Sequence, residues 1–137
     1  MTKIKLQNVE YMPSIFEQGI LYVSNEYQIA GHLCACGCGE KVWTPLGPVD
    51  WSVMMDKNGP SMRPSIGNGQ LNCKSHYVIK NGNILWCYAM TNENTEFDLN
   101  VANIKRENYY KNLYSNQGFF NRIKNWITAL FRKKILS

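Results

Sequence analysis

Cysteines carry the clearest chemical signal in this sequence of 137 residues. Three of them alternate within five residues, as Cys34, Cys36 and Cys38, and Cys73 follows 35 residues after Cys38. The neighbouring glycines let the backbone curl, so that the three thiols can turn toward one point. Zinc takes four soft or borderline ligands in a tetrahedron, commonly from two separate chain segments. The pattern therefore predicts one closed zinc site with a structural role.

Six side chains compete for the four positions of this site, because both histidines of the chain flank the cysteines. The candidates are Cys34, Cys36, Cys38, Cys73, His32 and His76. One solution takes the four cysteines. The other takes two cysteines of the cluster with Cys73 and His76, whose spacing is common in zinc pairs. If no metal binds, the cysteines are packed free thiols or a redox pair.

The composition and the first residues of the chain favour a reducing compartment, where clustered cysteines commonly bind a metal. Apolar residues make up 45% of the chain and charged residues 18%, which is a globular composition. The first residues show no signal-peptide core, and no apolar run reaches the roughly 18 residues of a membrane span. We therefore expect a cytoplasmic protein, in which clustered cysteines bind metal more often than they form disulfides. The odd count of five cysteines also argues against a complete disulfide set.

The elements that must position these donors are short strands. Alternating and β-branched residues predict strands at 20–24, 40–44 and 49–55. A loop with two glycines and a proline is expected at 63–69. The clearest hairpin joins 75–80 to 83–88 through Asn81-Gly82, which suits a type I′ turn. Cys87 lies in the second of these strands, and we predict that it is a core residue.

The C-terminal part of the chain has a different character. Helices are predicted at 99–114 and, from apolar residues spaced three and four apart, at 118–135. After Glu107 there are six basic and no acidic residues, whereas the rest of the chain is near neutral. The sequence thus predicts an α+β protein: a small zinc-stapled antiparallel sheet with glycine-rich loops in residues 1–98, then one or two helices in a basic segment at 99–137.

The basic helix has three interpretations. It packs on its own domain, binds a partner protein, or lies on an anionic membrane surface through its aromatic face. Nucleic acid is not an expected partner, because the body is near neutral and the cysteine spacing does not match a C2H2 finger.

The ordered motifs of the chain resemble a family of small bacterial proteins. They are His32–Glu40, Thr44–Leu46, Asp50-Trp51, Pro64–Asn68 and Cys73–Tyr77. This string, between about residues 20 and 88, is similar to the BubE-like family, formerly a domain of unknown function, which is associated with bacterial ubiquitin-like conjugation operons. The chain departs from the expected pattern at two positions. Ala35 stands where a proline is expected, and Gly69 stands where an aromatic residue is expected.

The resemblance implies a protease that trims or removes a ubiquitin-like protein through a serine nucleophile. Such a serine needs a base within hydrogen-bond reach and donors for the oxyanion. Ser65 is the candidate nucleophile, with the backbone amides that follow it as donors. His76 and His32 are candidate bases if zinc takes the four cysteines, and Asp50 could orient the imidazole. The expected partners are the ubiquitin-like protein or its conjugation enzymes.

Two other functions stay open at this point. Ser65 follows a proline, where serine is commonly a turn residue, and His76 is a ligand in the second zinc solution. The chain would then be a non-catalytic zinc adaptor of a ubiquitin-like conjugation or antiviral defence system. A metalloprotease is the third candidate, with zinc-bound water and Glu40 as the base. It requires an open coordination position on the metal.

Overall fold

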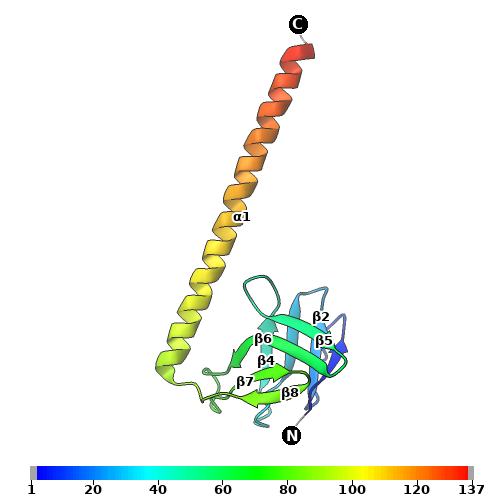
Figure 1. Cartoon of the computed structure of the whole chain (residues 1–137), viewed down its shortest axis with the longest axis vertical. Coiled ribbons are helices and arrows are strands. Elements are labelled where there is room, and N and C mark those ends of the chain that lie inside the picture. The colour runs from blue at the N-terminus through cyan, green and yellow to red at the C-terminus, as the bar shows by residue number, and fades with distance from the viewer. Residues whose placement is uncertain (1–2, 136–137) are drawn as a thin grey trace. The chain divides into compact units, whose positions relative to one another are not determined.

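A computed structural model describes the backbone of residues 3–135 and the side chains up to residue 132. The chain divides into two compact units, Met1–Asn100 and Val101–Ser137. The first unit contains two four-stranded sheets, and Figure 1 labels β2, β4 and the four strands of the second sheet, β5 to β8. A single C-terminal helix follows them, and this arrangement confirms the predicted α+β class.

The first sheet has the strand order β1-β2-β3-β4. Its strands are β1 (Lys5–Asn8), β2 (Ile20–Ser24), β3 (Ile29–Leu33) and β4 (Lys41–Pro45). β1 runs parallel to β2, and the other neighbours are antiparallel. The predicted strand at 20–24 has the bounds of β2, and the one at 40–44 is displaced by one residue from β4. The short strands β1 and β3 were not predicted.

The second sheet is antiparallel throughout, in the order β5-β6-β7-β8. Its strands are β5 (Ser52–Asp56), β6 (Gly59–Gly67), β7 (His76–Lys80) and β8 (Asn83–Trp86). The hairpin between β7 and β8 is confirmed, because Asn81 and Gly82 have φ angles of 51° and 72°. Two successive positive φ angles are what a type I′ turn requires.

The loop predicted at 63–69 is wrong for its first five residues, which belong to β6. β6 pairs with β5 on one side and with β7 on the other, as far as Ile66↔Tyr77 and Gly67↔His76. The β6–β7 register shifts between Met62 and Ile66. Such an irregularity accommodates Pro64, which has no N–H to give to a regular ladder.

The two sheets of the first unit share one hydrophobic core. The first sheet contributes Leu21, Val23, Ala30 and Val42, and the second contributes Met62, Ile66, Tyr77 and Ile79. The thiol of Cys34 is part of the same buried cluster. The prediction that Cys87 is a core residue is wrong, since this side chain is exposed. β8 ends at Trp86, so the alternation that was extrapolated to Cys87 no longer applies.

Helix α1 (Asn92–Ile135) is continuous through residues 115–117, where the sequence suggested a gap between two helices. It begins after Thr91, whose hydroxyl accepts a hydrogen bond from the amide of Asn94 at 3.1 Å, as at many helix N-termini. Polar residues and Gly118 lower helix propensity by less than about 1 kcal/mol each, which does not end a helix. Among the described residues, none of the helical segments combines the length and apolarity needed to cross a membrane.

Candidate active site and metal centre

Four cysteines converge in the first unit. The sulfur atoms of Cys34, Cys36, Cys38 and Cys73 all lie within 4.8 Å of one another. Cys34 Sγ is 3.5 Å from Cys36 Sγ and 3.8 Å from Cys73 Sγ. A tetrahedral zinc with Zn–S bonds of about 2.3 Å separates its sulfurs by about 3.8 Å. The cluster could therefore hold a metal ion, and His76 is not part of it.

Two turns bring these cysteines together. Cys34 directly follows β3, and its amide donates to the carbonyl of Glu40, which closes the loop that carries three of the thiols. Gly37 and Gly39 have φ angles of 86° and 84°, so the predicted glycine curl is present. Cys73 lies in the connection between β6 and β7. There Lys74 donates its backbone amide to the carbonyl of Leu71.

Polar side chains surround the sulfurs and were not predicted as part of the site. Ser75 Oγ lies 3.1 Å from Cys34 Sγ and 3.4 Å from Cys73 Sγ. Asn68 Nδ2 donates to Ser75 Oγ at 2.9 Å and to Cys34 Sγ at 3.7 Å. Burial raises the pKa of the Cys73 thiol, but hydrogen bonds with the Ser75 side chain and backbone outweigh it and lower the pKa to about 7. The hydrogen bonds with Ser75 thus favour the thiolate of Cys73, the form that binds metal.

Ser65 and His76 form a hydrogen-bonded pair outside the cysteine cluster. His76 Nε2 lies 2.9 Å from Ser65 Oγ, and His76 Nδ1 lies 3.0 Å from the carbonyl oxygen of Tyr88. A carbonyl oxygen can only accept, so Nδ1 carries the proton of the neutral imidazole. We infer that Nε2 offers its lone pair to the Ser65 hydroxyl. This is the tautomer that a general base requires.

The β6–β7 ladder explains why the imidazole reaches Ser65. His76 lies opposite Gly67 in the register. The amide of Asn68 donates to the Ser75 carbonyl, and the His76 carbonyl accepts from Cys87 on the other side of β7. Hydrogen-bonded and non-hydrogen-bonded pairs alternate in an antiparallel ladder, so Gly67↔His76 is a non-bonded pair with its backbones close together. The ring of His76 extends diagonally along the ladder toward Ser65, two residues before Gly67 on β6.

The same register leaves one amide directed away from β7. Gly67 and His76 form a non-hydrogen-bonded pair, so the N–H of Gly67 points away from β7. Ile66 and Tyr77 form the adjacent hydrogen-bonded pair, so the N–H of Ile66 points toward β7. On the opposite side, β5 ends its pairing at Ser52↔Arg63 and does not reach Gly67. The amide of Gly67 is therefore on a part of β6 that β5 does not cover.

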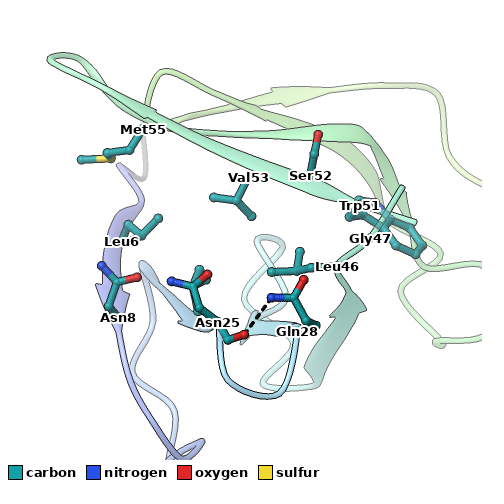
Figure 2. Close-up of a pocket in the computed structure, with 11 residues that line it drawn as sticks. Leu6, Asn8, Asn25, Gln28, Leu46, Gly47, Trp51, Ser52, Val53 and Met55 are labelled. Atoms are coloured by element: carbon teal, nitrogen blue, oxygen red, sulfur yellow. Dashed lines mark hydrogen bonds between the residues drawn. The ribbon is translucent and has the colours of Figure 1, made fainter. Parts of the chain in front are cut away.

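Trp51 links this site to a neighbouring pocket. Its indole N–H donates to the carbonyl of Ser65 at 3.3 Å. Trp51 also lines a pocket of about 450 Å³ between the edge strands of the two sheets. Figure 2 shows Leu6, Leu46 and Val53 around this space, with the amides of Asn25 and Gln28 at one side. The Gln28 side chain donates to the Asn25 carbonyl at 2.7 Å.

His32 has a different environment from His76. It is buried, and its Nε2 lies 2.8 Å from the hydroxyl oxygen of Tyr77, which also accepts from the amide of Ala35 at 3.3 Å. Burial lowers the pKa of His32 to about 4. The Nδ1 atom has no hydrogen-bond partner among the described residues. These contacts tie the cysteine loop to β7, and a role of His32 as a base stays a prediction from the sequence.

The group that contacts Nδ1 of His76 is the backbone carbonyl of Tyr88, whereas the expected group was the carboxylate of Asp50. The position on Nδ1 that Asp50 was expected to occupy is held by the Tyr88 carbonyl. The amide of Asp50 donates to the carbonyl of Gly47. An orienting role for Asp50 therefore also stays a prediction. Tyr88 could not be found from sequence, because a backbone carbonyl has no residue signature.

The fold and site define a small β-rich domain with a serine–histidine pair beside a candidate metal centre. The family described as "Bacterial ubiquitination-like system serine protease (BubE)" matches residues 8–87, and the chain belongs to this family. The match confirms the predicted resemblance and extends from β1 to just beyond β8. It ends before α1. No curated protein and no solved structure matches the chain.

Proposed function

We propose that this protein is a serine peptidase that releases a ubiquitin-like protein from a C-terminal extension or a conjugated target. The contact between His76 Nε2 and Ser65 Oγ at 2.9 Å is the observation that carries the proposal. The family description supports the substrate class, since it names a ubiquitination-like system and a serine protease. The free thiols suit a reducing compartment, so we place the protein in the cytoplasm.

The chemistry follows from the inferred tautomer. Nε2 of His76 takes the proton as Ser65 Oγ attacks the scissile carbonyl carbon, and the Tyr88 carbonyl stabilises the imidazolium through Nδ1–H. The intermediate collapses when His76 gives that proton to the departing amine, which leaves an ester on Ser65. Water then hydrolyses the ester by the same proton path in reverse.

The oxyanion needs a donor that is not already used in the sheet. The register assigns the Ile66 amide to pairing with Tyr77, so it is not available. The amide of Gly67 is directed away from β7 and follows Ser65 by two residues. We therefore propose the Gly67 N–H as a donor to the oxyanion.

The metal in this proposal is zinc with a structural role. Four thiolates from two chain segments suit Zn²⁺, and four protein ligands leave no position for a reactive water. When bound, the ion would join the loop after β3 to the β6–β7 connection. It would thereby fix the start of β7, where His76 lies.

The test is cleavage of a purified ubiquitin-like protein from a system of this kind, with a short C-terminal extension. We expect the wild type to remove the extension and Ser65→Ala to lose at least a thousandfold in rate. Ser52→Ala is the matched control, because Ser52 is exposed on β5 and should leave the rate unchanged.

Two results would contradict the proposal. Equal cleavage by Ser65→Ala and the wild type would exclude Ser65 as the nucleophile. Binding of the ubiquitin-like protein without cleavage by the wild type would instead indicate a zinc adaptor.

A further inference from the structure

The last third of α1 has a broad apolar face. Seven large apolar side chains between residues 119 and 131 are exposed: Phe119, Phe120, Ile123, Trp126, Ile127, Leu130 and Phe131. Phe120 and Trp126 expose 69% and 65% of their surface. At 3.6 residues per turn, the seven positions cover an arc of about 140°. The face is therefore wide, and it runs for about 20 Å along the helix.

Cations border this face on both sides. On the helical wheel Lys124 lies about 20° beyond Phe131, and Arg122 lies about 40° beyond Trp126. The chain has no acidic residue after Glu107. Long basic side chains at the margin of an apolar face can extend to an anionic layer while their methylene groups stay in apolar contact. The face is thus matched to an apolar partner with a negatively charged boundary.

A second copy of the helix does not fit these features. Two such faces would bring basic borders together, and no acidic residue is present in this region to compensate them. The knob positions Phe119, Ile123, Trp126 and Leu130 have the spacing of a coiled coil. Upstream, the same spacing falls on Asn116 and Asn112, which are polar, so the apolar seam ends at Phe119. The apolar seam is therefore shorter than the three to four heptads that a coiled coil needs.

We propose that residues 119–131 bind the surface of an anionic lipid bilayer. A planar interface can accept an apolar arc of this width, which inserts at the boundary of headgroups and acyl chains. Trp126 at the edge of the arc suits that depth, because indole combines an apolar body with a polar N–H. Arg122 and Lys124 contact the lipid phosphates. This inference is independent of the peptidase proposal, since α1 lies outside the residues that the family matches.

Flotation of the full chain with lipid vesicles tests the inference. The probes are vesicles of phosphatidylcholine alone and with about one third phosphatidylglycerol. We expect binding to the anionic vesicles, and at least tenfold weaker binding to the neutral ones. Ile123→Ser with Leu130→Ser removes two side chains from the centre of the face and should weaken binding at least tenfold.

Asn125→Ser with Thr128→Ser is the matched control, because both positions lie on the opposite side of the helix and neither pair changes the charge. This control should bind like the wild type. Circular dichroism of each variant verifies that the helix is retained. Arg122→Gln and Lys124→Gln should each lower affinity for anionic vesicles roughly fivefold, and added salt should do the same.

Several outcomes would overturn the inference. One is that the wild type does not float with anionic vesicles, and another is that both double variants lose binding equally. A dimer that depends on Ile123 and Leu130 without vesicle binding would assign the face to a second copy. Binding of an acidic ubiquitin-like protein through the same two residues, again without vesicle binding, would assign it to a protein partner.

Discussion

His76 Nε2 lies 2.9 Å from Ser65 Oγ, and the two residues belong to neighbouring strands of one sheet. Ser65 lies on β6 in the stretch between Met62 and Ile66 where the β6–β7 register shifts, and its carbonyl accepts a hydrogen bond from the indole of Trp51. His76 begins β7, and its Nδ1 contacts the Tyr88 carbonyl. A nucleophile and base on rigid elements are held close to their reactive geometry before substrate arrives. The reactivity of Ser65 should therefore be measurable without the natural substrate.

A fluorophosphonate probe should react with Ser65 in the resting protein. Oγ attacks phosphorus, fluoride leaves and His76 takes the hydroxyl proton. His76→Gln removes the base, so we expect the labelling rate to fall about 10²- to 10⁴-fold. Mass spectrometry of the labelled peptide checks the position. Ser52→Ala should label normally, and labelling of any serine other than Ser65 would contradict the assignment.

Asp50→Asn tests which group orients His76. Because the Tyr88 carbonyl accepts from Nδ1 at 3.0 Å, the tautomer does not require a carboxylate. We expect Asp50→Asn to keep the labelling rate within about threefold, whereas loss of the orienting aspartate in a serine triad costs about 10⁴-fold. A decrease of a hundredfold or more, with unchanged circular dichroism, would make Asp50 the third member of the site.

Two cysteine substitutions, one inside the cluster and one outside it, test the metal site. Cys73→Ser removes a thiolate from the cluster, and we expect the purified protein to lose its bound zinc and at least about 3 kcal/mol of unfolding free energy. Cys87→Ser is the control, because Cys87 is exposed and outside the cluster. It should keep about one zinc per chain and change stability by less than about 0.5 kcal/mol. Metal analysis and urea unfolding measure both quantities. Equal zinc content in the two variants would contradict the ligand assignment.

Features that depend on local chemistry could be predicted from the sequence. The Asn81-Gly82 hairpin follows from the φ angles that these residues tolerate, and the convergence of cysteines follows from ligand chemistry. β6 was missed because Pro64 and Gly67 favour a loop when read alone. Pairing with strands distant in sequence overrides that preference. The contact of the Tyr88 carbonyl with His76 and the direction of the Gly67 amide depend on register, which a single sequence does not specify.

Gly69 lies against the start of α1. It is buried, and a Cβ atom at this position would overlap the side chain of Thr95 in the first turns of α1. The residues that begin the helix thus occupy space that a larger residue at position 69 would need. We expect Gly69→Ala to cost about 1–3 kcal/mol, or to detach the start of the helix.

The control is to make Gly69→Ala in a protein that also carries Thr95→Gly, because this second change removes the atoms that the new Cβ would meet. Thr95→Gly costs less than about 0.5 kcal/mol by itself through lower helix propensity, because threonine is already a weak helix former. In this background Gly69→Ala should cost less than about 0.5 kcal/mol, so the two substitutions should couple by about 1 kcal/mol or more. Urea unfolding of the four proteins, together with amide exchange at residues 92–96, measures the coupling. Additive effects with unchanged exchange would show that the start of α1 does not pack against Gly69.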